Sequence, residues 1–269
     1  MGQWRASARI VGRIIAGITG ASFSAAGAYV ADITPPEKRA QAFGLVGAAF
    51  GLGFIPVGSL RALGRHPTVI GLTGTMVCGF MAQMILQSVW ALYNQARFDW
   101  TLRAVGLSLM VVGLTTALVQ GVLVRVLTTR LGERRLLVLG LSTSILGHLA
   151  FALADRGWMM YAFIFPFALG GLAGPATQSI ISREVGPSEQ GELQGSINSL
   201  SGLAAIAGPL VGTGLLARFG PDGAHPHIPG APFFAAAGFV TLGLLLALRL
   251  FARASAREIA GPSPSTQRS

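Results

Sequence analysis

The stretch Thr129-Arg-Leu-Gly-Glu-Arg-Arg135 joins two apolar runs, residues 105–127 and 136–154. Each run is long enough to cross a lipid bilayer, which takes about 20 apolar residues. Short loops that are rich in arginine stay on the cytoplasmic side of a membrane. Gly132 permits the tight reversal of direction, because glycine adopts backbone conformations that other residues avoid. The sequence therefore predicts a cytoplasmic loop, with a pure topology-setting role as the alternative to a gating role for Arg130, Gly132, Glu133, Arg134 and Arg135.

The composition indicates a membrane protein. Of the 269 residues, 52% are hydrophobic and only 11% are charged, with a mean hydropathy of +0.61. A soluble domain carries about 25% charged residues. The apolar runs do not alternate with a period of two, so they predict helices rather than a membrane β-barrel. The fold class expected is an all-α, polytopic membrane helical bundle.

The net charge of +10 does not indicate nucleic-acid binding. Lys38 is the only lysine, and the arginines lie in loops and tails, which is the pattern expected for orientation in a membrane. The single cysteine, Cys78, lies inside an apolar run. It gives no information about disulfides or metals. No metal site and no cofactor are expected.

Eight membrane spans are predicted. The first, residues 14–31, follows a basic start and has a signal peptide as its alternative reading. A polar loop containing a proline pair separates the first span from the second. The eight spans cover residues 14–31, 42–60, 68–92, 105–127, 136–154, 158–181, 196–219 and 232–251.

An internal repeat indicates a transporter. Asp32-Ile-Thr-Pro-Pro-Glu37 recurs as Glu184-Val-Gly-Pro-Ser-Glu189, and the helix after each copy reaches a proline followed by Val-Gly or Leu-Val-Gly. Transporters are built from such repeats, with the substrate site near the midplane of the membrane. We expect gating or helix-end roles for Asp32, Pro56, Gly208 and Pro209.

Several of these stretches resemble the major facilitator superfamily, and within it the tetracycline-resistance-like drug:proton antiporters. The resemblance rests on five stretches. They are residues 13–21 taken together with residues 28–33, Phe50-Gly-Leu-Gly53, Arg130-Leu-Gly-Glu-Arg-Arg135, Pro175-Ala-Thr-Gln178 and Glu189-Gln-Gly-Glu-Leu-Gln-Gly195. It implies a partial, truncated major facilitator fold with about eight of the family's twelve helices. Residues 1–60 would be a remnant of the amino-terminal bundle, residues 61–254 the carboxy-terminal six-helix bundle, and residues 255–269 a disordered tail. If the first two helices are inverted relative to the family, both chain ends are cytoplasmic.

The resemblance also identifies departures from the family. Thr129 replaces the acid of the loop motif, Ser144 replaces an acid of the tetracycline exporters, and Thr116 replaces their histidine, whereas Gln120 matches. These departures make tetracycline itself a poor candidate substrate.

Few ionisable side chains lie inside the predicted spans. Arg13 matches an arginine that the family uses in proton transfer, and its alternative role is to fix a helix end. His148 is a second candidate, with a packed neutral histidine as the alternative. Gln83 and Gln87 lie four residues apart on one helix face, and Gln120 either binds substrate or joins helices. The predicted substrate and proton path thus consists of Arg13, Gln83, Gln87, Gln120 and His148.

The function expected is proton-coupled efflux of a small drug-like molecule across the cell inner (plasma) membrane by a multi-pass transporter. Its partners would be the small-molecule substrate, protons and membrane lipid, and no enzyme activity or nucleic acid is expected. The alternative is a transport-inactive remnant that only inserts in the membrane. The sequence leaves the oligomeric state open.

Overall fold

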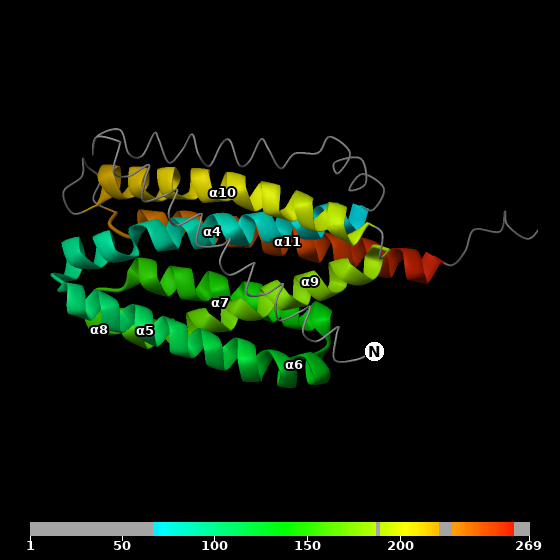
Figure 1. Cartoon of the computed structure of the whole chain (residues 1–269), viewed down its shortest axis with the longest axis horizontal. Helices are drawn as coiled ribbons and strands as arrows, with labels where there is room; N and C mark the ends of the chain where they lie inside the picture. Colours follow the sequence, from blue (N-terminus) through cyan, green and yellow to red (C-terminus); the bar gives the residue numbers. More distant parts are fainter. Residues whose placement is uncertain (1–66, 187–188, 221–227, 261–269) are drawn as a thin grey trace, which may run out of the picture. The chain divides into compact units, whose positions relative to one another are not determined.

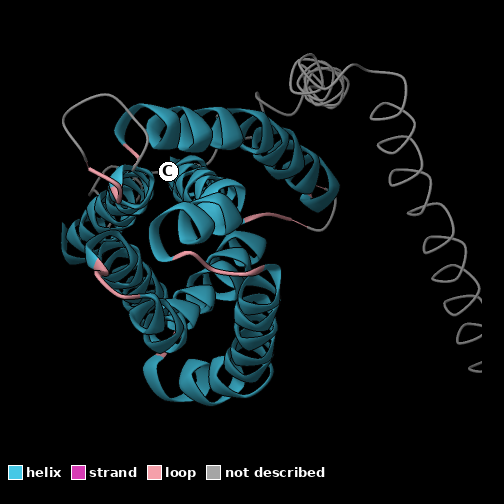
Figure 2. Ribbon diagram, turned by 90° about the vertical axis from the view of Figure 1, so that its left-hand side faces the viewer, coloured by secondary structure: helices cyan, strands magenta, loops and turns pink. Residues whose placement is uncertain are grey.

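A computed structural model describes residues 67–186, 189–220 and 228–260. Within these ranges the chain consists of helices joined by short loops and has no strand (Figure 2). The elements are α4 (Pro67–Phe98), α5 (Leu102–Leu118), the π-helical turn η2 (Val119–Leu123), α6 (Val124–Leu131), α7 (Glu133–Leu153), α8 (Gly157–Ala168), the 3-10 turn η3 (Leu169–Leu172), α9 (Ala173–Glu184), α10 (Gln190–Phe219) and α11 (Ala231–Ala260).

Six of these helical stretches are long and apolar enough to cross a membrane. They correspond to the last six of the predicted spans, so the all-α bundle is confirmed for the described residues. The stretches are Thr68–Phe98, Leu102–Leu131, Glu133–Leu153, Gly157–Glu184, Leu193–Phe219 and Ala231–Arg253. The first two predicted spans, and the division of the chain near residue 60, lie outside the described residues and stay predictions.

The helix ends differ from the predicted limits for local reasons. The span predicted at 105–127 begins earlier because the side chain of Thr101 accepts a hydrogen bond from the backbone N–H of Ala104. It continues to Leu131 and stops at Gly132, which has φ 76°. The predicted disordered tail begins at 255, whereas α11 runs to Ala260. Alanine, arginine and glutamate are favourable helix residues, so the helix extends past the apolar run.

The predicted break in the sixth span is confirmed. Between α8 and α9 the helix tightens into η3 at Leu169–Leu172, which contains Gly170-Gly171 and lies shortly before Pro175. A proline and small residues permit this change of helix type when neighbouring helices pack around the freed backbone groups.

The packing centres on α4 and α7. Helix α4 packs against α10 and α11, and α7 packs against α8, η3, α9 and α11 (Figure 1). The apolar core includes Leu72, Ile85, Leu136 and Leu172, all fully buried. A second cluster, with Tyr93, Phe151 and Phe233 as large members, lies near the other ends of α4 and α7. Large side chains on α5, such as Leu107 and Leu114, are exposed, as expected for a face toward lipid.

Candidate functional site

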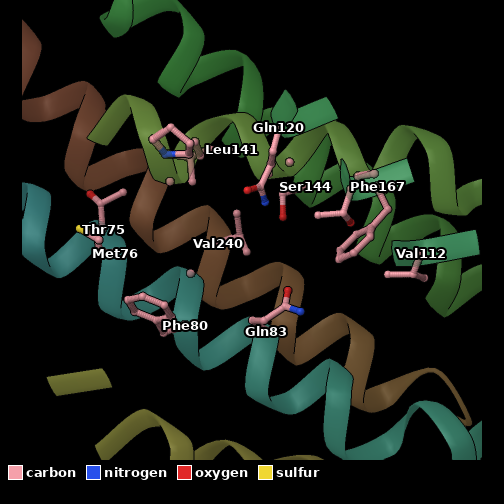
Figure 3. Close-up of a pocket in the computed structure, with 18 residues that line it drawn as sticks. Thr75, Met76, Phe80, Gln83, Val112, Gln120, Leu141, Ser144, Phe167 and Val240 are labelled. Carbon is pink, nitrogen blue, oxygen red and sulfur yellow. The ribbon is translucent and has the colours of Figure 1, made fainter. Parts of the chain in front are cut away.

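A cavity of about 350 Å³ lies among the helices. Its walls come from α4, α5, η2, α7, α8, η3, α9 and α11, so nearly every described span contributes. Figure 3 shows Gln120 and Ser144 on one side of it and Gln83, on α4, facing them. The polar side chains of the lining are those of Thr75, Gln83, Thr116, Gln120 and Ser144.

The cavity lies halfway along the spans. The middle residue of the 31-residue span Thr68–Phe98 is Gln83, which lines the cavity. The midpoint of Gly157–Glu184 falls between Gly170 and Gly171, which also line it. For spans that cross the bilayer from end to end, this position corresponds to the membrane midplane.

Two irregular turns shape this cavity. The π-helical turn η2 carries Gln120, and the 3-10 turn η3 carries Gly170 and Gly171. A Cβ on Gly171 would lie 3.7 Å from Nε2 of Gln120, and one on Gly170 would lie 2.8 Å from Cβ of Ser144. The missing side chain of Gly170 therefore lets η3 approach Ser144 closely, whereas a Cβ on Gly171 would make only ordinary van der Waals contact with Gln120. Such π turns inside helices are frequent at functional sites.

A second cavity, of about 260 Å³, adjoins the first. The two share Gln83, Val112 and Phe167 among their lining residues. Gln87 lines the second cavity beside Gln83, which confirms that the two glutamines share one face of α4. The remaining lining is apolar or aromatic and consists of Leu86, Trp90, Leu109 and Phe151.

His148 is buried behind the cavity rather than in it. Its side chain is 2% exposed, and its Nδ1 atom lies 2.8 Å from the carbonyl oxygen of Ser144. A carbonyl only accepts hydrogen bonds, so Nδ1 carries the proton and Nε2 keeps a free lone pair. Nε2 has no hydrogen-bond partner among the described residues. The ring packs edge-on against Phe167, with 5.1 Å between centroids, and both Ser144 and Phe167 line the first cavity.

The arginine-rich loop ties three helices together. Gly132 has the positive φ that the tight reversal needs. The Oε1 atom of Glu133 accepts a hydrogen bond from Oγ of Ser179, and Nη2 of Arg183 lies 2.8 Å from it. The guanidinium of Arg134 lies 5.5 Å from the centre of the Phe251 ring on α11. Arg130 and Arg135 are exposed.

The helix-end role predicted for Gly208 and Pro209 is wrong, whereas the gating role stays a prediction. Both lie inside α10, which continues to Phe219. A proline inside a membrane helix is tolerated where neighbouring helices pack around it. Here a Cβ on Gly208 would lie 2.4 Å from Cβ of Met84, so Gly208 allows α10 to approach α4 closely. Three other predicted site residues, Arg13, Asp32 and Pro56, lie outside the described residues.

Sequence reasoning missed several members of the site. Thr116, Ser144 and Phe167 line the cavity but were not among its predicted residues. The first two were signalled by their positions, since each replaces an ionisable residue of the family. Ser179 and Arg183, the partners of Glu133, lie four residues apart on α9, a spacing that puts them on one helix face. No cluster of three or more potential metal ligands occurs in the described part of the chain.

Comparisons with a family profile and with individual known proteins agree with each other. The sequence profile of the Major Facilitator Superfamily matches residues 72–268. The tetracycline resistance protein of class C from Escherichia coli is 34% identical over an alignment of 259 positions, and this alignment covers 77% of this chain and 65% of that protein. The class G protein of Vibrio anguillarum is 32% identical over 258 residues, covering 76% of this chain and 66% of the relative. The chain thus spans slightly less than two thirds of the length of these relatives.

Proposed function

Because the chain belongs to the Major Facilitator Superfamily, we propose that it is an exporter of a small drug-like molecule, driven by protons, in the cell inner (plasma) membrane. The relatives carry the name of tetracycline resistance proteins, which supports an antibiotic-like substrate. Thr116 and Ser144 line the cavity. The family resemblance matches them to a histidine and an acid of the tetracycline exporters, which favours a substrate other than tetracycline.

The observation that carries this proposal is the depth of the first cavity. Gln83 lies at the centre of its span, and Gln120 lies opposite it across the cavity. Substrate sites of transporters built from repeats lie near the bilayer midplane, between helices that are interrupted there. The interruptions at η2 and η3 match that arrangement.

Among the described residues, His148 is the proposed proton-binding group. Charged and ionisable residues inside the membrane are costly, and a functional role is their default interpretation. Nε2 is the atom that would take the proton, on its free lone pair. Ser144 and Phe167 contact His148 and also line the cavity, so a charge on the ring would act on the cavity wall through them. Arg13 is proposed to serve the same path from the first predicted span.

The arginine-rich loop is proposed to gate the cytoplasmic side. Its positive charge supports a position on the cytoplasmic side. The contacts of Glu133 with α9 and of Arg134 with α11 hold the ends of these helices together when the site is closed to the cytoplasm. Opening of the gate would break them.

Drug efflux in a bacterial host without its own exporters tests the function. Expression of the 269-residue chain is expected to lower the accumulation of an aromatic antibiotic, and a proton uncoupler is expected to abolish that effect. Accumulation that is unchanged by the inserted chain would overturn the proposal and favour the alternative of a transport-inactive membrane remnant.

A further inference from the structure

We infer that the two adjoining cavities form one bipartite site for an uncharged aromatic amphiphile, with its hydrogen-bonding part in the first cavity and its ring in the second. That this molecule is a transported substrate rests on the proposed function. The selectivity of the site can be measured by binding alone.

The first cavity supplies hydrogen bonds without charge. The amides of Gln83 and Gln120 each offer one acceptor and two donor hydrogens, and Thr116 and Ser144 add hydroxyls. Gln83 and Gln120 lie on opposite walls, so a ligand amide, hydroxyl or carbonyl between them is reached from two sides (Figure 3). A small number of such groups in an apolar cavity fixes the orientation of a ligand.

The second cavity supplies a rigid aromatic wall. Nε1 of Trp90 donates a hydrogen bond to Ser108 at 2.9 Å, which fixes the indole. Trp90 and Phe151 meet edge to face with 5.1 Å between centroids, and Phe151 and Phe167 lie 5.3 Å apart. Chained ring contacts of this kind favour another aromatic ring in offset or edge-on geometry.

Phe167 connects the two parts. It lines both cavities, together with Gln83 and Val112. A ligand that passes this boundary places its polar group beside Gln83 and its ring beside Phe167. The cavities are about 350 and 260 Å³, so together they fit a drug-sized molecule.

The lining discriminates against charge. None of the described residues that line either cavity is an acid, a base or a histidine. A ligand that carries a permanent charge loses its hydration at this depth and, among the described lining residues, finds only amide and hydroxyl dipoles in return. The aromatic rings attract a cation weakly compared with a carboxylate partner. An uncharged ligand avoids this loss and uses the same hydrogen bonds.

Two matched probes test the inference in the full chain. The uncharged probe is N-(4-nitrobenzyl)acetamide, and the charged one is (4-nitrobenzyl)trimethylammonium, which has the same ring and a permanent cation. Nitroaromatic rings quench tryptophan fluorescence, so binding next to Trp90 is followed by quenching in detergent solution. The variant Trp90→Phe identifies the part of the signal that comes from the second cavity.

The uncharged probe should quench the fluorescence saturably. The affinity for the cation should be lower by at least about tenfold, as for one lost favourable interaction. Gln120→Met, which keeps the size and removes the amide, should weaken the uncharged probe by up to about tenfold. Gln120→Glu and Gln83→Glu, each nearly isosteric, should reverse the preference at pH 8. Gln95→Glu, the same change outside the linings of both cavities, should leave it unchanged.

Equal or tighter binding of the cation to the native chain would overturn the inference. So would an unchanged preference in both glutamate variants. Selective binding without any efflux would leave this inference standing and refute the proposed function, whereas efflux of cations would do the reverse.

Discussion

Arg183, in the last turn of α9, reaches back to Glu133, in the first turn of α7, with 2.8 Å between Nη2 and Oε1. The side chain of Glu133 is 15% exposed and that of Arg183 is 75% exposed. The carboxylate also accepts from Ser179 and lies at a helix amino terminus, where negative charge is favourable. Glu133 therefore joins α7 to α9. Its partner Ser179 lies 46 residues further along the sequence.

Glu133→Gln should lower the stability of the chain slightly. The substitution removes the charge while keeping the size, and an ion pair with so exposed an arginine is worth about 0.5–1 kcal/mol. The apparent unfolding midpoint in detergent should fall by a few degrees. Glu184→Gln, an exposed neighbour of Arg183, is the matched control. Equal midpoints for the two variants would show that the pair contributes nothing.

Gly132→Ala should destabilise the helical hairpin by about 1–3 kcal/mol. With φ 76° and ψ 163°, Gly132 has a backbone conformation that is nearly confined to glycine. Gly113→Ala serves as the control, because Gly113 is inside α5 and a Cβ there meets no atom within 4 Å. Thermal unfolding of the two variants compares the positions directly. A loss at Gly113 as large as that at Gly132 would contradict the role of the backbone angle.

Gly208→Ala should separate α10 from α4. The added Cβ would lie 2.4 Å from Cβ of Met84 and 3.2 Å from the backbone nitrogen of Ile85, so the helices must move. Overpacking of this kind costs about 1–3 kcal/mol. Gly214→Ala, in the same helix with open space around it, should be neutral or stabilising. If both variants unfold at the same temperature, the close approach at Gly208 is not required.

His148→Phe separates packing from proton binding. A phenyl ring keeps the edge-on contact with Phe167 and removes both ring nitrogens. The variant should therefore fold and bind the uncharged probe, but lose exchange driven by a pH gradient in proteoliposomes. His148→Ala, which leaves a cavity at a buried position, should instead be destabilised by about 2–4 kcal/mol. Gradient-driven exchange at the native rate in His148→Phe would mean that His148 is only a packed residue.

The six described spans could be predicted from the sequence, because each is an apolar run of sufficient length between polar turns. The helix ends were less predictable. The cap at Thr101 and the helical residues up to Ala260 depend on local hydrogen bonds and propensities that hydropathy does not report. The continuation of α10 through Pro209 was also not predictable from hydropathy, because it depends on packing against α4.

The candidate site was predicted only in part. Gln83 and Gln87 share a face of α4 by their spacing, and Gln120 followed from the family resemblance. That Gln120 faces Gln83 depends on the irregular turns η2 and η3, which sequence periodicity does not indicate. His148 lies one turn from Ser144, yet packing places it behind the cavity wall. The partners of Glu133 come from a distant helix and were not foreseen.

Gln83 and Gln120 are proposed to form the centre of the transport site. The most direct test is pH-gradient-driven accumulation of N-(4-nitrobenzyl)acetamide in proteoliposomes that contain the native chain, Gln83→Met, Gln120→Met or the control Gln95→Met. We predict saturable accumulation for the native chain and the control, and a loss of up to about tenfold for each cavity variant, as expected when a substrate hydrogen bond is removed. Accumulation at the native rate in both cavity variants would contradict the assignment of the site.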